Sequence, residues 1–280
     1  MVQRDKIFYG VVATAVFLCL LIFAWCMRPQ EEKQTVQIVI FGDSCYGNIR
    51  DESSIADRLE KLSGKTVYNA AFGGTCASRW DKDCRLDYSG DSLSLVALTK
   101  AVYAHDFGVQ QAIQPIGDIT AYFTETIDGL EHVDFSTVET VIIGYGLNDY
   151  CLGISLDNEK DLMDENTFAG ALRKSAEQLK KVNPDIRIIF VTSTYMWLID
   201  SRLTCEEYNG GGGLLEEYVE KEIQVAEELG VEVINLYHDF FPHENWEDWE
   251  IYSFDGLHPN EAGRALISEK IATHLEETAK

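Results

Sequence analysis

Four short polar motifs in this 280-residue chain contain the residue types needed for catalysis. In chain order they are Gly42-Asp43-Ser44, Asn69 with Gly73-Gly74-Thr75, Gly146-Leu147-Asn148-Asp149, and Asp255-Gly256-Leu257-His258-Pro259. The first three follow apolar runs that are typical of strands. Because ligands bind beyond the carboxyl ends of the strands in an open parallel α/β sheet, we expect the motifs to meet at one edge. A single motif proves little, since Gly-Asp-Ser also occurs in turns that cap helices.

Three of these side chains form the set that nucleophilic catalysis requires. A serine hydroxyl becomes a good nucleophile when a base removes its proton, and a histidine is well directed when a third group fixes its tautomer. Ser44 is the predicted nucleophile, and Asp255 and His258, three residues apart, supply the other two groups. We expect the Asp255 carboxylate to bind one imidazole nitrogen while the other nitrogen faces the serine.

Attack on an ester creates an oxyanion, which must be stabilised by preorganised hydrogen-bond donors. The predicted donors are the backbone amides of Ser44 and Gly74 and the side-chain amide of Asn148. A glycine suits this part because its backbone can approach a ligand closely. Gly73 is the alternative glycine at this point. Asp149, like Asp43, is interpreted as a residue that braces a turn or loop.

In this order, the four motifs resemble those of the SGNH or GDSL-type hydrolases, and the match spans nearly all of the chain beyond residue 36. The resemblance implies a flavodoxin-like three-layer α/β/α fold and no metal or other cofactor. The family's usual offset from Asn69 selects Gly74 rather than Gly73. The site residues that the resemblance implies are Ser44, Gly74, Asn148, Asp255 and His258.

Two features depart from the family pattern and leave the substrate open. Cys45 follows the nucleophile, where a small buried thiol is the favoured interpretation. An insertion around 78–136 is longer than one crossover needs, and we expect it to form part of a substrate wall. Four aromatic residues near the ends of the third and fourth strands are candidate substrate contacts, with core packing as the alternative for each: Tyr145, Tyr150, Tyr195 and Trp197. Trp246 and Trp249 are further candidates for contact with substrate at the opening of the active site.

The elements that must position these residues alternate between strands and helices. Short apolar runs predict strands at 36–41, 66–69, 140–143, 186–192 and 231–235. Helical patterns cover 55–62, 92–104, 167–182, 214–229 and 261–277. This alternation predicts a five-stranded parallel sheet covered by helices on both faces.

An uncharged apolar run at 7–27 is long enough to cross a bilayer. We therefore expect a cytoplasmic stub and transmembrane signal-anchor at 1–28, a linker at 29–35 and a hydrolase domain at 36–280. Arg4 and Lys6 precede the run, which favours a cytoplasmic N-terminus and an extracytoplasmic catalytic domain. The alternative is a cleaved signal peptide and a secreted protein.

The formal net charge of −24 restricts the partners. Since residues 1–28 carry +2, the remaining residues carry −26, and such a surface repels nucleic acid and anionic lipid headgroups. A neutral small-molecule or carbohydrate ester fits better. Of the cysteines beyond the apolar run, Cys76 and Cys84 could close a short loop, but the spacing alone establishes no pairing, and the oligomeric state is open.

The sequence therefore predicts a serine esterase that works through a Ser44 acyl-enzyme, with O-acetyl groups on carbohydrate as the favoured substrate. Two other enzymatic interpretations share this machinery. A lipase or lysophospholipase would prefer long acyl chains, and an acyltransferase would pass the acyl group to a glycan. The alternative of another class is a non-catalytic binding module that keeps the SGNH fold.

Overall fold

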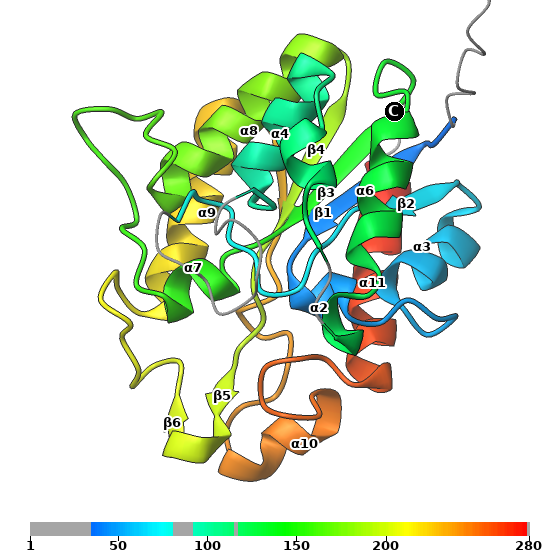
Figure 1. The fold of residues 1–280 in the computed structure, drawn as a ribbon. Coiled ribbons are helices and arrows are strands. Elements are labelled where there is room, and N and C mark those ends of the chain that lie inside the picture. The colour runs from blue at the N-terminus through cyan, green and yellow to red at the C-terminus, as the bar shows by residue number, and fades with distance from the viewer. Residues whose placement is uncertain (1–34, 81–91, 115–116, 279–280) are drawn as a thin grey trace, which may run out of the picture. The chain divides into compact units, whose positions relative to one another are not determined.

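The computed structural model describes residues 35–80, 92–114 and 117–278, all within one compact unit, Gln34–Lys280. A parallel sheet with the order β2-β1-β3-β4-β7 lies at its centre (Figure 1). Its strands are β1 (Ile38–Gly42), β2 (Val67–Asn69), β3 (Thr140–Gly144), β4 (Arg187–Val191) and β7 (Glu232–Ile234). All five predicted strands are present, and their order is that of a flavodoxin-like doubly wound sheet.

The adjacent strands β1 and β3 are buried along their whole length, which explains their continuous apolar sequences. Their register pairs Ile38 with Thr140 and Gly42 with Gly144. Both strands therefore end at the same level, and the chain leaves each of them at the same edge of the sheet. This edge is where the first and third polar motifs come together.

Helices cover both faces of the sheet and complete the predicted three layers (Figure 1). One face packs against four helices, α4 (Leu95–Ala104), α6 (Phe123–His132), α8 (Phe168–Val182) and α9 (Leu215–Leu229). The other packs against α3 (Ile55–Ser63) and α11 (Glu261–Glu277). We call the core beneath the four helices the first core and the core beneath α3 and α11 the second core. Along β1, Ile38 and Ile40 face the second core while Val39 and Phe41 face the first, as the alternation of side chains in a strand requires.

The predicted insertion at 78–136 contributes to the layers as well as to the edge of the sheet. Within its described part, α4 packs against α8, and α6 buries Phe123, Ile127 and Leu130 in the first core. The acidic stretch 81–91 lies outside the described residues. The expectation of a substrate wall is thus incomplete, because much of the segment is ordinary helical cover for the sheet.

The remaining elements are short and lie in the connections. They are α2 (Ser44–Gly47), α5 (Gly108–Gln111), α7 (Leu147–Cys151), α10 (Trp249–Tyr252), η1 (Asp118–Thr120), η2 (Ile199–Ser201) and η3 (Trp246–Asp248). An antiparallel hairpin joins β5 (Trp197–Leu198) to β6 (Leu203–Thr204). The hairpin and α10 project past the carboxyl ends of the strands, at the lower end of Figure 1.

The predicted anchor and most of the linker fall outside the described residues. Among residues 35–80, 92–114 and 117–278, the helices are too short or too polar to cross a bilayer.

Candidate active site

Ser44 lies at the tight turn between β1 and α2. Asp43 caps this short helix, and its Oδ1 accepts a hydrogen bond of 2.9 Å from the amide of Cys45. Burial raises the pKa of Asp43 to about 6, although the hydrogen bond from Cys45 opposes the shift. The Asp43 side chain therefore holds the turn, as expected for a bracing residue, and Ser44 stands at its tip.

The loop before α11 brings Asp255 and His258 to Ser44. His258 Nε2 lies 2.9 Å from Ser44 Oγ, and His258 Nδ1 lies 2.6 Å from Asp255 Oδ2. The ring can therefore receive the serine proton on one side while the carboxylate binds the opposite nitrogen. This is the order of contacts that proton transfer from a serine nucleophile requires.

The carboxylate of Asp255 also organises its own loop. Its Oδ1 accepts hydrogen bonds from the amides of Leu257, at 3.0 Å, and His258, at 2.7 Å. Partial burial favours a higher pKa for Asp255, but the hydrogen bonds from the backbone and ring of His258 outweigh it and lower the pKa. Asp255 is thus held as the anion that fixes the imidazole.

Three further contacts fix the shape of this loop. Ser253 Oγ accepts from the amides of Asp255 and Gly256, and the carbonyl of Gly256 accepts from the Trp197 amide at 2.9 Å. Gly256 has a φ of +85°, and a Cβ there would lie 2.4 Å from the Trp197 carbonyl oxygen. The loop therefore needs glycine at this position, and the start of the hairpin supports it.

The predicted oxyanion donors lie at neighbouring ends of β1, β2 and β3. Gly74 has a φ of +76° in the loop after β2, a conformation that glycine adopts readily. Asn148, in α7 after β3, donates from Nδ2 to the carbonyl of Thr75 in that same loop, at 2.9 Å. The Gly73 amide donates to the Tyr122 hydroxyl at 2.8 Å, and the choice of Gly74 over Gly73 as the oxyanion glycine stays a prediction.

Asp149 binds the segment that follows the second motif, and it was expected to brace a turn or loop. Its carboxylate is fully buried and accepts from the amides of Ala77 and Ser78 and from the Ser78 hydroxyl. Burial raises the pKa of Asp149, and these three donors oppose the shift. The residue braces the loop that carries Gly74 against α7.

The four aromatic residues expected to contact substrate are buried, with exposed fractions of 2% for Tyr145, 0% for Tyr150, 4% for Tyr195 and 2% for Trp197. Tyr150 donates its hydroxyl to the Tyr208 carbonyl at 3.0 Å, which gives it a packing role. Tyr195 packs edge to face against Trp197, the first residue of the hairpin. Their burial favours core packing, which was the alternative interpretation for each, and a contact with substrate stays a prediction.

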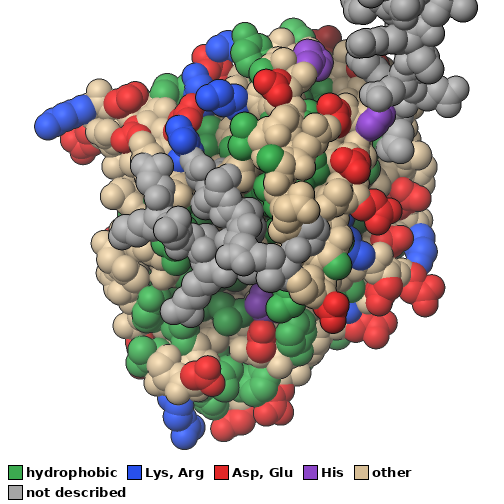
Figure 2. Space-filling view, in the orientation of Figure 1, with side chains coloured by type: hydrophobic (Ala, Val, Ile, Leu, Met, Phe, Trp, Pro, Cys, Tyr) green, Lys and Arg blue, Asp and Glu red, His purple; other side chains and the backbone are tan. Residues whose placement is uncertain are grey.

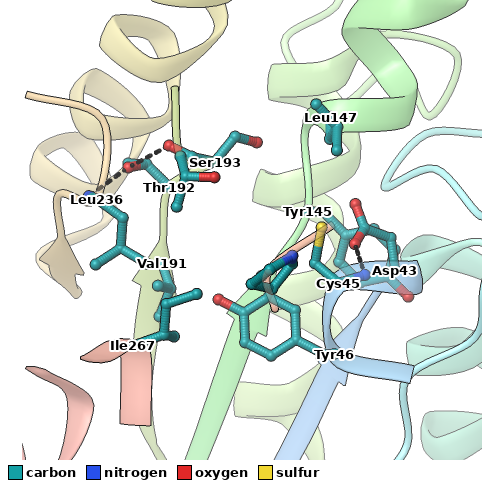
Figure 3. A pocket seen from close by; sticks show the side chains of 13 residues that line it. Asp43, Cys45, Tyr46, Tyr145, Leu147, Val191, Thr192, Ser193, Leu236 and Ile267 are labelled. Atoms are coloured by element: carbon teal, nitrogen blue, oxygen red, sulfur yellow. Dashed lines mark hydrogen bonds between the residues drawn. The ribbon is translucent and has the colours of Figure 1, made fainter. Parts of the chain in front are cut away.

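A pocket lies between the ends of β1, β3 and β4, beneath the nucleophile turn (Figure 3). Asp43, Cys45, Tyr46 and Tyr145 stand on one side. Opposite them lie residues at or after the end of β4, Leu236 after β7, and Ile267 of α11. Ser44 and His258 are not among its lining residues, so the pocket does not enclose the reacting atoms. Burial raises the pKa of the Cys45 thiol, which keeps it protonated and agrees with its interpretation as a packing thiol.

One residue beside the site was not among the sequence candidates. The ring of Phe254 stacks on His258 with centroids 5.6 Å apart and planes 14° apart, and 54% of the residue is exposed. Ile251, in the preceding helix α10, is 47% exposed. Figure 2 shows that hydrophobic side chains gather on this lower part of the face, over the hairpin and α10.

Within the part of the chain that the structure describes, no group of three or more His, Cys, Asp or Glu side chains is placed to hold a metal ion. Cys45, Cys151 and Cys205 are free thiols. Cys84, the candidate partner of Cys76, lies in the undescribed stretch 81–91, so that pairing stays a prediction.

Known proteins share both the sequence pattern and the fold. The model of the GDSL-like lipase/acylhydrolase family matches residues 40–266, whereas no curated protein is significantly similar to the chain. A solved structure from Lactobacillus plantarum has 20% identity and a TM-score of 0.60, covering 88% of this chain and 99% of that one.

Two further solved structures have names that state an activity. A possible lipase from Chitinophaga pinensis is 14% identical, with a TM-score of 0.55 and coverage of 86% and 98%. Est24, a carbohydrate acetylesterase from Sinorhizobium meliloti, is 14% identical, with a TM-score of 0.52 and coverage of 86% and 99%. At these identities the likeness shows the fold, and the family match carries the assignment. The chain therefore belongs to the GDSL-like lipase/acylhydrolase family, and it is a hydrolase that acts on ester bonds.

Proposed function

We propose that the protein is a serine esterase that hydrolyses carboxylic esters through a Ser44 acyl-enzyme. The observation that carries the proposal is the continuous chain of contacts from Asp255 Oδ2 to His258 Nδ1, at 2.6 Å, and from His258 Nε2 to Ser44 Oγ, at 2.9 Å. In this mechanism His258 takes the serine proton as Oγ attacks the ester carbonyl, and then gives it to the departing alcohol. Water, deprotonated by the same ring, releases the acid.

The oxyanion formed in each step is assigned to the amides of Ser44 and Gly74 and the side chain of Asn148. Asn148 Nδ2 already donates one hydrogen bond to the Thr75 carbonyl, which aims the amide group along the loop that carries Gly74. An NH₂ group has two donors, so a second one is left for substrate. Fixed donors of this kind stabilise developing charge without reorganisation.

We propose O-acetyl groups on carbohydrate as the substrate class. The net charge of −24 favours neutral esters over phosphate-rich or anionic lipid surfaces. The exposed ring of Phe254 beside His258 offers a flat apolar face, which suits the apolar face of a sugar. The relative named as a carbohydrate acetylesterase supports the same class.

The test of the activity compares wild type, Ser44→Ala and Ser201→Ala on p-nitrophenyl acetate. Ser201 is an exposed serine of η2 and serves as the matched control. Loss of turnover in Ser44→Ala with full activity in Ser201→Ala is expected. Equal activity in all three proteins would refute the assignment. A series from acetyl to octanoyl esters then tests the acyl group, since preference for octanoyl would favour a lipase over a sugar deacetylase.

We also propose that residues 7–27 anchor the protein in a membrane, with the hydrolase domain on the outer side. The support is the uncharged apolar run and the basic residues that precede it. The full chain should stay with membranes during alkaline carbonate extraction, whereas a chain that begins at residue 29 should be released. If expression of the full chain yields a soluble protein whose N-terminus lies near residue 28, cleavage and secretion are supported instead.

A further inference from the structure

The guanidinium of Arg50 draws together the two loops that carry the nucleophile and the oxyanion glycine. Its Nε donates to the carbonyl of Gly47, at the end of α2, at 2.8 Å. Its Nη1 donates to the carbonyl of Asn69 at 2.8 Å, and its Nη2 donates to the carbonyl of Ala71. One planar group therefore joins the helix that begins with Ser44 to the loop that follows β2.

Tyr122, directly before α6, holds the same loop from the other side. The Arg50 guanidinium lies over its ring, 4.3 Å from the centroid, and the Tyr122 hydroxyl accepts from the amide of Gly73 at 2.8 Å. That hydroxyl lies 3.4 Å from Asn48 Oδ1, to which it can donate. Arg50 and Tyr122 thus form one connected unit that contacts the backbone before the turn at residues 73 and 74 and at its first residue, Gly73.

The charge of Arg50 is partly withdrawn from water and is used to bind backbone groups. Burial lowers the pKa of Arg50, so desolvation of its charge has a free-energy cost. Among the ion pairs of the described residues, none involves Arg50, and its three hydrogen bonds described above go to backbone carbonyls. Because a guanidinium is a planar fork, it holds these carbonyl acceptors in one fixed geometry.

We propose that Arg50 and Tyr122 are positioning residues that set the direction of the Gly74 amide in the oxyanion hole. Tyr122 engages the amide of Gly73, which lies one residue before the proposed oxyanion amide of Gly74, and Gly74 itself has a φ of +76° in the same loop. The inference rests on the proposed function, and it gives the segment before α6 a part in catalysis. Removal of either side chain leaves the reacting groups in place and loosens one oxyanion donor.

The test compares Tyr122→Phe and Arg50→Lys with Tyr103→Phe. Tyr103 is an exposed tyrosine of α4, and the ammonium group of Lys181 lies over its ring, so it is a matched control. Tyr122→Phe keeps the ring and loses the hydroxyl, whereas Arg50→Lys keeps the charge and loses the fork. The measurements are kcat and KM for p-nitrophenyl acetate, with kcat expressed per active site titrated by a fluorophosphonate.

We expect kcat to fall about 10-fold in Tyr122→Phe and about 10- to 100-fold in Arg50→Lys, with KM changed less than about 2-fold, because a misplaced oxyanion donor weakens transition-state binding. Tyr103→Phe should match wild type. A purely structural role would lower the number of active sites and leave kcat per site unchanged, and that result would overturn the proposal.

A second measurement separates this inference from the proposed function. Hydrogen exchange of peptides that span residues 69–76 reports the order of the loop whether or not the protein hydrolyses esters. We expect faster exchange there in Tyr122→Phe than in wild type, and no change in Tyr103→Phe. An unchanged rate of hydrogen exchange in Tyr122→Phe would overturn the proposal that Tyr122 positions this loop. If hydrogen exchange is faster in Tyr122→Phe but wild type hydrolyses no esters, the positioning of the loop is supported and the proposed function is refuted. If Arg50→Lys fails to fold, Tyr122→Phe carries the test.

Discussion

Asp255 has two structural duties at the active site, one for each carboxylate oxygen. Oδ2 binds the imidazole of His258, and Oδ1 accepts from the amides of Leu257 and His258. The same side chain therefore shapes the loop and fixes the tautomer of the ring on it. These duties can be separated experimentally, because an asparagine can keep the backbone contacts while it presents an NH₂ group to the ring.

Asp255→Asn is expected to lower kcat by about 10³- to 10⁴-fold, because the amide favours the wrong tautomer of His258. The unfolding midpoint should change little, since the asparagine oxygen can still accept from the loop amides. Steady-state kinetics and thermal unfolding of the same preparations test both statements. More than a tenth of the wild-type kcat in the variant would show that the carboxylate is not needed.

Asp43 makes stability depend on pH in a defined direction. Burial raises its pKa to about 6, so its neutral form is favoured in the folded state. A raised pKa contributes stability at low pH that is lost as the pH rises through the folded-state value. Between pH 5 and 8, wild type should lose about 1 kcal/mol of unfolding free energy relative to Asp43→Asn. Urea unfolding of both proteins at the two pH values tests this, and a pH-independent difference would contradict it.

At this scale, residue type predicted some parts of the site and missed others. Ser44, Asp255 and His258 could be proposed because their chemistry is complementary, and the structure brings them together. Arg50 and Tyr122 left no such signal, because their partners are backbone groups of distant loops. For the buried aromatic residues the sequence left substrate contact and core packing open, since proximity to a strand end does not reveal which loop covers a side chain.

At the scale of elements, the acid–base loop depends on the hairpin beside it. The Trp197 amide donates to the Gly256 carbonyl, and Gly256 adopts a φ of +85° close to the Trp197 carbonyl. The hairpin is thus a support for the loop that holds His258. Its own strands are two residues long, too short for any periodicity in the sequence to predict them.

Gly256→Ala should therefore lower kcat by about 10-fold or more, because a Cβ would lie 2.4 Å from the Trp197 carbonyl oxygen and must displace the loop. Gly64→Ala is the matched control. Gly64 also has a positive φ, of +66°, yet nothing lies within 4 Å of the position that a Cβ would take, so only stability should fall, by about 1 kcal/mol. Equal kcat values in the two variants would contradict the support role.

Asn260 begins α11 and also ties down the loop before it. Its Oδ1 accepts from the Gly263 amide, and its Nδ2 donates to the carbonyls of Ile251 and Ser253. Asn260→Ala should cost about 1 kcal/mol of stability as a lost cap, and it should also lower kcat. Thr167→Ala, which removes the cap of α8, should lower stability alone. Unfolding curves and kcat are measured for both variants. An unchanged kcat in Asn260→Ala would show that Asn260 acts only as a helix cap.

The sheet could be predicted well because its strands are short, buried and apolar, and a short β-branched run bounded by turn residues is typical of a buried strand. The helix α6 was missed although Phe123, Ile127 and Leu130 recur at helical spacing. The helical spacing was present in the sequence, but 78–136 was interpreted as an insertion and no helix was predicted at 123–132. The short helices at the strand ends are set by capping and loop contacts, which a single sequence shows poorly.

For the molecule as a whole, the acidic charge should discriminate between substrates. Acidic side chains gather over the side of the domain that carries α3 and α11 (Figure 2), and the chain has a net charge of −24. For an ester with an extra carboxylate, KM should fall as salt rises from about 0.01 to 0.5 M, because the Debye length shortens from about 30 Å to a few ångströms. For a neutral ester of the same size, KM should stay constant. Equal salt dependence for both esters would contradict a role for the field.

The most direct test of the central claim is to locate the covalent adduct that a fluorophosphonate forms with the folded protein. Peptide mass spectrometry should find one adduct, on Ser44, and it should be absent from Ser44→Ala and greatly slowed in His258→Ala. An adduct on another residue, or undiminished labelling of Ser44→Ala, would contradict the account.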